Sequence, residues 1–163
     1  MDIVSPATRS RMMAGIRSSN TKPELILRKS LHSLGFRYKL NTKILGHTPD
    51  VVLKKYNVAI FIHGCFWHRH THCKYATTPK TNVHKWIVKF DENKKRDSRI
   101  EKALLESGWR VAVIWECWLK RKMELDWLFE WIINSKTPYV SWPHVNESEN
   151  NSMANMDANI PIV

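Results

Sequence analysis

Residues Pro49–His68 read PDVVLKKYNVAIFIHGCFWH and set the architecture of the chain. Two apolar runs, Val51–Leu53 and Val58–Ile62, lie on either side of four residues with a turn composition. This pattern predicts a β-hairpin whose second strand is buried within a sheet. We therefore expect a central strand that leads directly into the histidine- and cysteine-rich residues after it.

Helices and further strands are expected on both sides of this hairpin. Thr21 and Glu24 have the spacing of a capping box and Gly35 terminates the same periodic segment, which predicts a helix over 21–35. Apolar periodicity predicts the remaining elements, namely helices over 6–16, 83–107 and 124–133 and strands over 36–40 and 110–115. The order of elements indicates an α/β fold with a mixed central β-sheet flanked by helices.

The 163 residues suffice for one domain with an apolar core. We expect this domain over residues 1–135 and a polar, mostly disordered tail over 136–163. No run approaches eighteen apolar residues, and residues 1–10 lack the pattern of a secretory leader. Three cysteines, an odd number, argue against a disulfide scaffold. A monomeric cytoplasmic protein is therefore expected.

The charge of the chain indicates a polyanionic partner. There are 26 lysines and arginines against 15 acidic residues, a net charge of +11. The tail over 136–163 carries one lysine and three acidic residues, so the positive excess lies in the folded part. Basic side chains gain binding free energy from a nucleic acid by releasing its condensed counterions. Nucleic acid is the expected partner, whereas a membrane is not.

Cysteine and histidine are concentrated in a segment that has no hydrophobic periodicity. Cys65 and Cys73 bound a segment that also contains His70 and His72, and Cys117 follows the strand expected over 110–115. Three thiolates and one imidazole form a typical structural zinc site. Spacing alone allows either histidine to supply the imidazole, but His72 is adjacent to Cys73 and would have to bend back sharply, which favours His70. Four protein ligands leave no position for substrate, so the zinc stabilises the loop and catalysis lies elsewhere.

A candidate reaction centre lies at the edge of the expected hairpin. Asp50 precedes the first strand, and the second strand ends at His63, with His68 nearby. Magnesium needs only one or two carboxylates, because water and phosphate oxygens complete its octahedron. A histidine can transfer a proton near neutral pH. Asp50 therefore predicts a Mg²⁺ site, although an aspartate at a strand start is also common without any metal.

Aromatic residues are the third functional element. Phe66 and Trp67 lie between the expected zinc ligands, and Trp86 begins the helix that follows, among lysines. An aromatic side chain exposed on a basic surface can wedge between base pairs and distort a duplex. The alternative is that these side chains only pack the loop.

Several of these motifs together resemble the very short patch repair DNA mismatch endonucleases. The likeness runs from about Thr8 to Leu119 and has a high specificity, because its motifs occur in order and nearly without gaps. The motifs are TRSRMM, TKPE, Pro49-Asp50, HGCFWH at 63–68, the NKKRD run at 93–97 and the segment from Gly108 to Cys117. The resemblance implies a fold similar to that of type II restriction endonucleases.

The resemblance also implies a role for each candidate residue. Asp50 would hold catalytic Mg²⁺, His68 would be the general base or acid, His63 a second catalytic histidine, and Glu24 a water-mediated support for the metal. The zinc ligands would be Cys65, His70, Cys73 and Cys117, and the DNA wedge would be Phe66, Trp67 and Trp86, with residues 1–20 gripping the other side of the duplex. The family nicks one strand 5′ of the thymine in T:G mispairs that arise from deamination of 5-methylcytosine.

Three departures from the family pattern bear on the sites. The segment from Cys65 to Cys73 is one residue longer than usual, which leaves His70 and His72 as alternatives. Ile62 replaces a threonine of some members, so only its backbone carbonyl would serve the Mg²⁺. The lysine of the wider nuclease superfamily is absent, and His63 lies near its place.

The sequence thus predicts a Mg²⁺-dependent, zinc-containing DNA mismatch endonuclease that acts on double-stranded DNA with a T:G mispair. We expect it in the bacterial cytoplasm at the nucleoid, with mismatch-repair proteins as further candidate partners. Two other functions share the basic surface and the zinc: a DNA-binding or mismatch-sensing module without catalysis, and a nuclease acting on matched DNA. Asp50, His63 and His68 separate the enzyme from the binding module.

Overall fold

The structure, a computed structural model, describes residues 19–121 and 125–143 and five residues before them: Ser5, Ala7, Thr8, Arg11 and Gly15. Most of the helix expected over 6–16, most of the DNA-gripping segment 1–20 and residues 144–163 of the expected tail lie outside the described residues.

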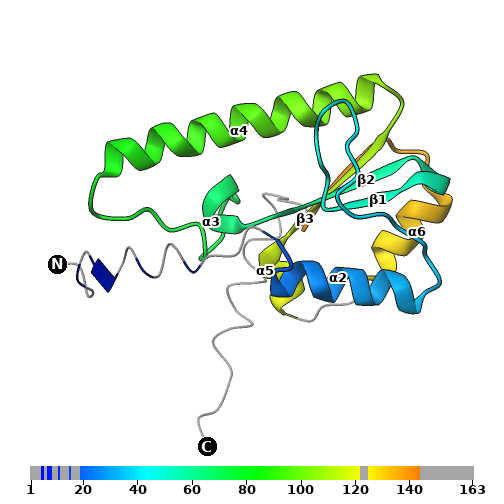
Figure 1. Cartoon of the computed structure of the whole chain (residues 1–163), viewed down its shortest axis with the longest axis horizontal. Coiled ribbons are helices and arrows are strands. Elements are labelled where there is room, and N and C mark those ends of the chain that lie inside the picture. Colours follow the sequence, from blue (N-terminus) through cyan, green and yellow to red (C-terminus); the bar gives the residue numbers. More distant parts are fainter. Residues whose placement is uncertain are drawn as a thin grey trace, which may run out of the picture.

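A four-stranded mixed sheet forms the centre of the molecule, as predicted (Figure 1). Its strands are β1 (Val51–Leu53), β2 (Val58–His63), β3 (Arg110–Trp115) and β4 (Tyr139–Trp142), in that order across the sheet. β1 pairs antiparallel with β2 through a short 3₁₀ turn, η1 (Lys54–Tyr56), so the predicted hairpin is confirmed. β2 and β3 run parallel, with His63 opposite Trp115. Parallel pairing brings the carboxyl ends of β2 and β3 to the same edge.

Helices cover both faces of this sheet (Figure 1). One long helix, α4 (Val83–Glu106), runs along one face, and the other helices lie on the opposite side or at the sheet edge. These are α2 (Lys22–Ser33), α3 (Cys65–His68), α5 (Glu116–Lys120) and α6 (Asp126–Asn134). The predicted helices over 21–35, 83–107 and 124–133 correspond to α2, α4 and α6 within a few residues.

Successive side chains of each strand point to opposite faces of the sheet, so the strands contribute to two apolar layers. Val51, Ile60 and Ile114 face α2, α5 and α6, where they pack with Leu27 and Leu31 of α2. The opposite face packs on α4 and is smaller; its buried residues are Ile44, Val52, Ala59, Leu104, Val111 and Val113. Because both faces of β2 and β3 are covered, these strands are continuous apolar runs in the sequence.

One prediction about secondary structure is incomplete and another is wrong. Within the tail expected over 136–163, Tyr139–Trp142 forms β4 and pairs parallel with β3, so the sheet extends beyond residue 135. Burial of Val140 against the core stabilises this strand, and the Trp142 ring stacks on Trp127 with a centroid separation of 4.6 Å. The segment over 36–40 is not a strand, since it contributes only an isolated bridge between Lys39 and Val52.

Candidate active site and metal centre

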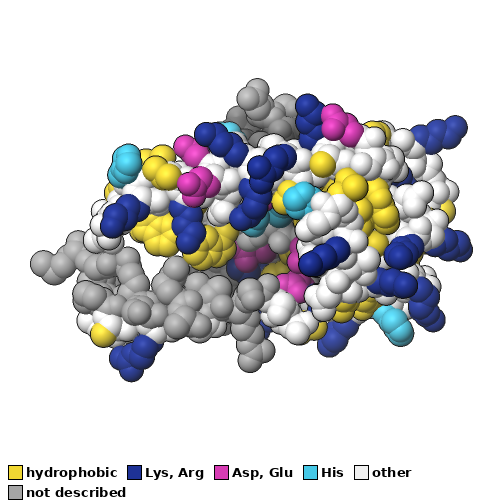
Figure 2. Space-filling view, turned by 45° about the horizontal axis from the view of Figure 1, so that its top comes forward, with side chains coloured by type: hydrophobic (Ala, Val, Ile, Leu, Met, Phe, Trp, Pro, Cys, Tyr) yellow, Lys and Arg dark blue, Asp and Glu magenta, His cyan; other side chains and the backbone are white. Residues whose placement is uncertain are grey.

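A cavity of about 620 Å³ opens where β2 ends. Figure 2 shows a hollow on this face of the molecule, in which acidic and histidine side chains lie with lysine and arginine side chains around them. The cavity receives residues from α2, the β1 entry, β2, α3, α4 and α5. Its lining residues with polar or aromatic side chains include Glu24, Asp50, His63, Phe66, Trp67, His68, Arg96, Asp97 and Glu116.

Asp50 enters this cavity from the residue before β1. Its Oδ2 accepts a hydrogen bond of 2.7 Å from the backbone amide of Ile62, its neighbour across the hairpin. Burial raises the pKa of Asp50 to about 6, although the Ile62 hydrogen bond opposes this shift. Because the ionised carboxylate is partly desolvated and lies beside Glu24, a cation at its free oxygen is electrostatically favourable. Ile62 contacts Asp50 through its amide, and the role predicted for its carbonyl stays a prediction.

His63 and His68 meet in the same cavity, with their rings stacked at a centroid distance of 4.0 Å and an interplanar angle of 7°. His68 Nδ1 lies 2.5 Å from Asp97 Oδ2, across the gap between α3 and α4. This contact leaves His68 Nε2 as the nitrogen for a substrate. Burial, followed by the neighbouring charge of His68, lowers the pKa of His63 to about 3, so His63 is neutral at pH 7.

Asp97 is held ionised by its partners. Burial raises its pKa, but the hydrogen bond and charge of His68, together with His63 and Arg96, outweigh this and lower the pKa overall. The groups His63, His68 and Asp97 offer ligand atoms within 4.8 Å of one another. They are nevertheless poorly suited to one metal ion, because the ring lone pairs of two parallel, stacked imidazoles lie in parallel planes and do not converge. The arrangement fits a proton-transfer pair better.

Glu24 is buried at the start of α2 and lines the cavity. Its carboxylate accepts hydrogen bonds from the backbone amide of Asn20 at 2.9 Å, the Thr21 hydroxyl at 2.8 Å and Arg28 at 2.7 Å. The capping-box residues therefore interact, but Glu24 reaches the amide one residue before Thr21. The start of α2 does face the same cavity as Asp50, because Glu24 and Asp50 both line it.

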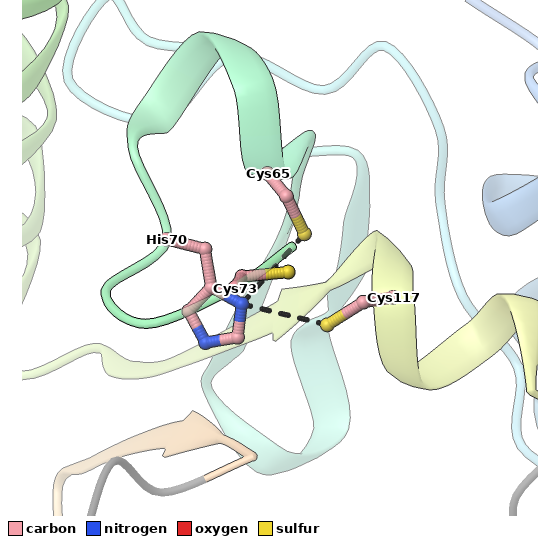
Figure 3. A group of neighbouring side chains, drawn as sticks. All are labelled: Cys65, His70, Cys73 and Cys117. Carbon is pink, nitrogen blue, oxygen red and sulfur yellow. Dashed lines mark hydrogen bonds between the residues drawn. The ribbon is translucent and has the colours of Figure 1, made fainter. Parts of the chain in front are cut away.

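A second cluster contains Cys65, His70, Cys73 and Cys117, whose ligand atoms all lie within 4.8 Å of one another (Figure 3). The structure brings together the four residues that the resemblance implied and distinguishes the two histidines, because His72 is exposed and outside the cluster. His70 is buried and its ring stacks on Trp115 at 4.1 Å.

The spacing of this cluster fits a tetrahedral ion. Zinc–sulfur bonds of about 2.3 Å and zinc–nitrogen bonds of about 2.05 Å place sulfur and nitrogen about 3.5 Å apart in a tetrahedron. His70 Nδ1 lies 3.7 Å from Cys65 Sγ and 3.4 Å from Cys117 Sγ. The hydrogen bond with Cys117 and burial raise the pKa of the Cys65 thiol, so a nearby cation would be needed to hold it as the thiolate. Thiolate-rich sites of this geometry prefer zinc.

Helix α3 connects the two sites, since Cys65 is its first residue and His68 its last. Glu116 fixes the start of this helix, because its Oε1 accepts a 3.0 Å hydrogen bond from the Cys65 amide. Glu116 Oε2 in turn pairs with Lys120 at 2.8 Å. The cysteine cluster and the cavity therefore share one short helix.

The wedge candidates Phe66 and Trp67 are both half-buried. They join Trp86 and Phe90 of α4 in an aromatic cluster in which Phe66 contacts the other three rings at 5.0–5.4 Å. Lys89 lies over the Trp67 ring at 5.4 Å. The aromatic cluster lies next to the cavity, which Phe66 and Trp67 also line. The three predicted wedge residues are therefore brought together beside the reaction centre.

Sequence reasoning missed Asp97 and Glu116 as site residues. Asp97 lies among the charged residues of α4, where a charge usually faces solvent. Only the packing of α3 against α4 brings it to His68. Glu116 follows β3 directly, and its adjacency to the predicted ligand Cys117 was the available signal.

Comparisons with known proteins identify relatives of this chain. The sequence model of a family described as DNA mismatch endonuclease Vsr matches residues 1–75. The type II nicking enzyme V.XorIIP of Xanthomonas oryzae pv. oryzae is 45% identical over 116 residues, which cover 71% of this chain and 85% of the relative. The DNA mismatch endonuclease Vsr of Escherichia coli is 37% identical over 137 residues, which cover 80% of this chain and 87% of the relative.

A more distant solved structure is the catalytic domain of the homing endonuclease I-Bth0305I. The match has 20% identity and a TM-score of 0.47 and covers 69% of this chain and 94% of that domain.

Among the described residues, no helix combines the length and the apolar character that a membrane span requires.

The relatives define the class of the protein, which is a DNA endonuclease. More particularly, the identity and coverage of the relatives place the chain in one family: it belongs to the Vsr family of DNA mismatch endonucleases. The resemblance drawn from the sequence is thereby confirmed.

Proposed function

We propose that this endonuclease nicks one DNA strand 5′ of the thymine in a T:G mispair, by Mg²⁺-dependent hydrolysis of a phosphodiester. The observation that carries the proposal is the convergence of Asp50, His63, His68 and Asp97 on one open cavity next to an aromatic cluster. A cavity with a carboxylate for a metal and a histidine for a proton suits phosphodiester hydrolysis.

The carboxylate of Asp50 fits a hard divalent cation. Its Oδ2 is engaged by the Ile62 amide, and burial disfavours its charge, so a cation at Oδ1 would offset both the desolvation and the repulsion from Glu24. Magnesium accepts one protein carboxylate with water and phosphate oxygens. Asp50 and the Ile62 carbonyl would hold the ion, which would supply electrostatic stabilisation of the scissile phosphate, and Glu24 would support it through water.

His68 handles the proton in this proposal. The hydrogen bond between Nδ1 and Asp97 orients the ring and stabilises the imidazolium, so Nε2 is free to accept the proton of the attacking water. The water oxygen forms a bond to phosphorus while the bond to the 3′ oxygen breaks, which leaves a 5′ phosphate and a 3′ hydroxyl. His63 stays neutral and holds the His68 ring by stacking.

The remaining residues hold the enzyme on its substrate. Cys65, His70, Cys73 and Cys117 would bind a structural zinc ion that fixes both ends of the loop carrying His68. Phe66, Trp67 and Trp86 would wedge into the duplex beside the mispair, because a T:G pair is weakly stacked and therefore easy to deform. The basic surface supplies contacts to DNA phosphates.

The test uses a labelled duplex with one T:G mispair and a duplex of the same sequence with a T:A pair. The proposal predicts nicking 5′ of the thymine in the T:G duplex with Mg²⁺, none after EDTA is added, and restoration by excess Mg²⁺. Asp50→Ala should bind the T:G duplex but not nick it. Equal nicking of both duplexes would favour a nuclease for matched DNA, and binding without nicking by the wild type would favour a mismatch sensor.

A further inference from the structure

The residues assigned above to the reaction centre include no lysine or arginine that would contact the negatively charged scissile phosphate. Four acidic residues line the cavity, namely Glu24, Asp50, Asp97 and Glu116. Arg96 is the only lysine or arginine among the described residues that line it. We infer that the guanidinium of Arg96 binds a non-bridging oxygen of the scissile phosphate and stabilises the charge that develops there during cleavage. This inference rests on the proposed function, because it concerns the same reaction centre.

The contacts of Arg96 hold its guanidinium at the cavity while leaving most of it available. One terminal nitrogen lies 3.2 Å from Asp97 Oδ1, the carboxylate oxygen that does not contact His68. The Arg96 side chain is 49% exposed, whereas that of Asp97 is 13% exposed. Arginine presents five N–H donors in a planar fork that matches two phosphate oxygens. Donors remain for a phosphate after Asp97 is satisfied.

The position of Arg96 relative to the reacting groups supports a direct contact. Arg96 lines the same cavity as Asp50 and His68 and its side chain is about half exposed, so a phosphate bound in that cavity is accessible to the guanidinium. Arg28 and Lys120, which pair with Glu24 and Glu116, do not line the cavity. A phosphodiester carries one negative charge and gains more in the transition state. A fixed cation at that point accelerates the reaction.

The alternative is that Arg96 only orients Asp97. In that case the guanidinium never touches DNA, and its loss acts through the hydrogen bond between Asp97 and His68. The two roles differ in one respect that can be measured: only a direct contact responds to a change at a particular phosphate oxygen.

The first experiment compares Arg96→Ala with Lys95→Ala, which removes an exposed positive charge from the same helix but from outside the cavity lining. The inference predicts that Arg96→Ala slows single-turnover nicking about 100-fold, the usual cost of losing one such donor. Its Kd for the mispaired duplex should rise less than about 3-fold, as should that of Lys95→Ala. Arg96→Lys should recover part of the rate. Similar losses in Arg96→Ala and Lys95→Ala would overturn the inference.

The second experiment places an Rp or an Sp phosphorothioate at the scissile phosphate. Sulfur is a poorer hydrogen-bond acceptor than oxygen, so the isomer with sulfur at the oxygen bound by Arg96 should be slowed more in the wild type than in Arg96→Ala. If each isomer is slowed by the same factor in both proteins, the direct contact does not exist. Asp50→Ala separates this result from the proposed function: normal nicking by that variant would refute the reaction centre itself.

Discussion

The two ends of the short helix α3 lie in chemically opposite sites. At its start, Cys65 belongs to a compact cluster of three sulfurs and one nitrogen, in which all but Cys73 are buried. At its end, His68 lines an open cavity of about 620 Å³ with carboxylates. The cysteine and histidine cluster, the closed site, offers four soft ligands and suits a structural ion. The cavity, the open site, offers hard carboxylate oxygens and leaves positions for water and phosphate. The four residues of α3 therefore link the candidate zinc cluster to the candidate active site.

The largest effect is expected from the closed site. Cys117→Ala should lose bound zinc and lower the unfolding midpoint by about 10 °C or more, because loss of a structural metal is among the few single changes that cost about 4 kcal/mol. Zinc analysis and thermal unfolding measure both effects. The matched control is His72→Ala, which removes a histidine of the same loop from outside the cluster and should keep one zinc per chain. A full complement of zinc in Cys117→Ala would exclude Cys117 as a zinc ligand.

In the open site, Asp97→Asn should slow nicking about 10- to 100-fold with little change in Kd, because the neutral amide orients His68 but does not stabilise its cation. Zinc content and the unfolding midpoint should stay near the wild type, unlike those of Cys117→Ala. Asp97→Glu should recover part of the rate. A loss of DNA binding equal to the loss of rate would assign Asp97 to binding instead.

The Mg²⁺ dependence of the reaction should vary with pH. Burial raises the pKa of Asp50 to about 6, so its carboxyl group is protonated below that pH and cannot hold a cation. Nicking should therefore fall as the pH drops through about 6, and a higher Mg²⁺ concentration should move the midpoint to lower pH because metal and proton compete. Rate profiles at two Mg²⁺ concentrations provide the measurement. A midpoint that does not move with Mg²⁺ concentration would show that another group controls the loss of nicking at acidic pH.

A smaller effect is expected at the aromatic cluster. Trp67→Ala should weaken binding of the T:G duplex about 10-fold, because base–aromatic stacking contributes about 1–3 kcal/mol, and should weaken binding of matched DNA less. Trp67→Phe keeps an aromatic face and should retain most of the preference. Competition binding with both duplexes measures the preference for the T:G duplex. Equal weakening on both duplexes would reduce Trp67 to a packing residue.

The sequence predicted the elements whose patterns are local. The hairpin around Pro49–His68, the long helix and the strand over 110–115 follow from periodicity and terminators, and they match β1, β2, α4 and β3. β4 was missed because four residues next to an Asn-rich segment carry little periodicity, and only pairing with β3 and the contact between Trp127 and Trp142 stabilise them.

The site residues also fall into two groups, those that the sequence alone could identify and those that required the tertiary structure. Asp50, the histidines and the cysteines could be selected because their residue types are rare in such density. The adjacency of His72 to Cys73 already favoured His70, and the path of the loop gives the physical reason, since Arg69 and His72 adopt positive φ angles and His70 is buried. Asp97 and Arg96 needed the packing of α3 on α4, which no local pattern specifies.

The central claim is that the open site holds the catalytic cation and the closed site does not. The most direct measurement is single-turnover nicking of a T:G duplex by Asp50→Asn, with zinc content determined on the same sample, since asparagine keeps an acceptor for the Ile62 amide. The account predicts one zinc per chain, near-normal DNA binding and a rate reduced at least about 1,000-fold at every Mg²⁺ concentration. A rate near that of the wild type, with zinc unchanged, would contradict it.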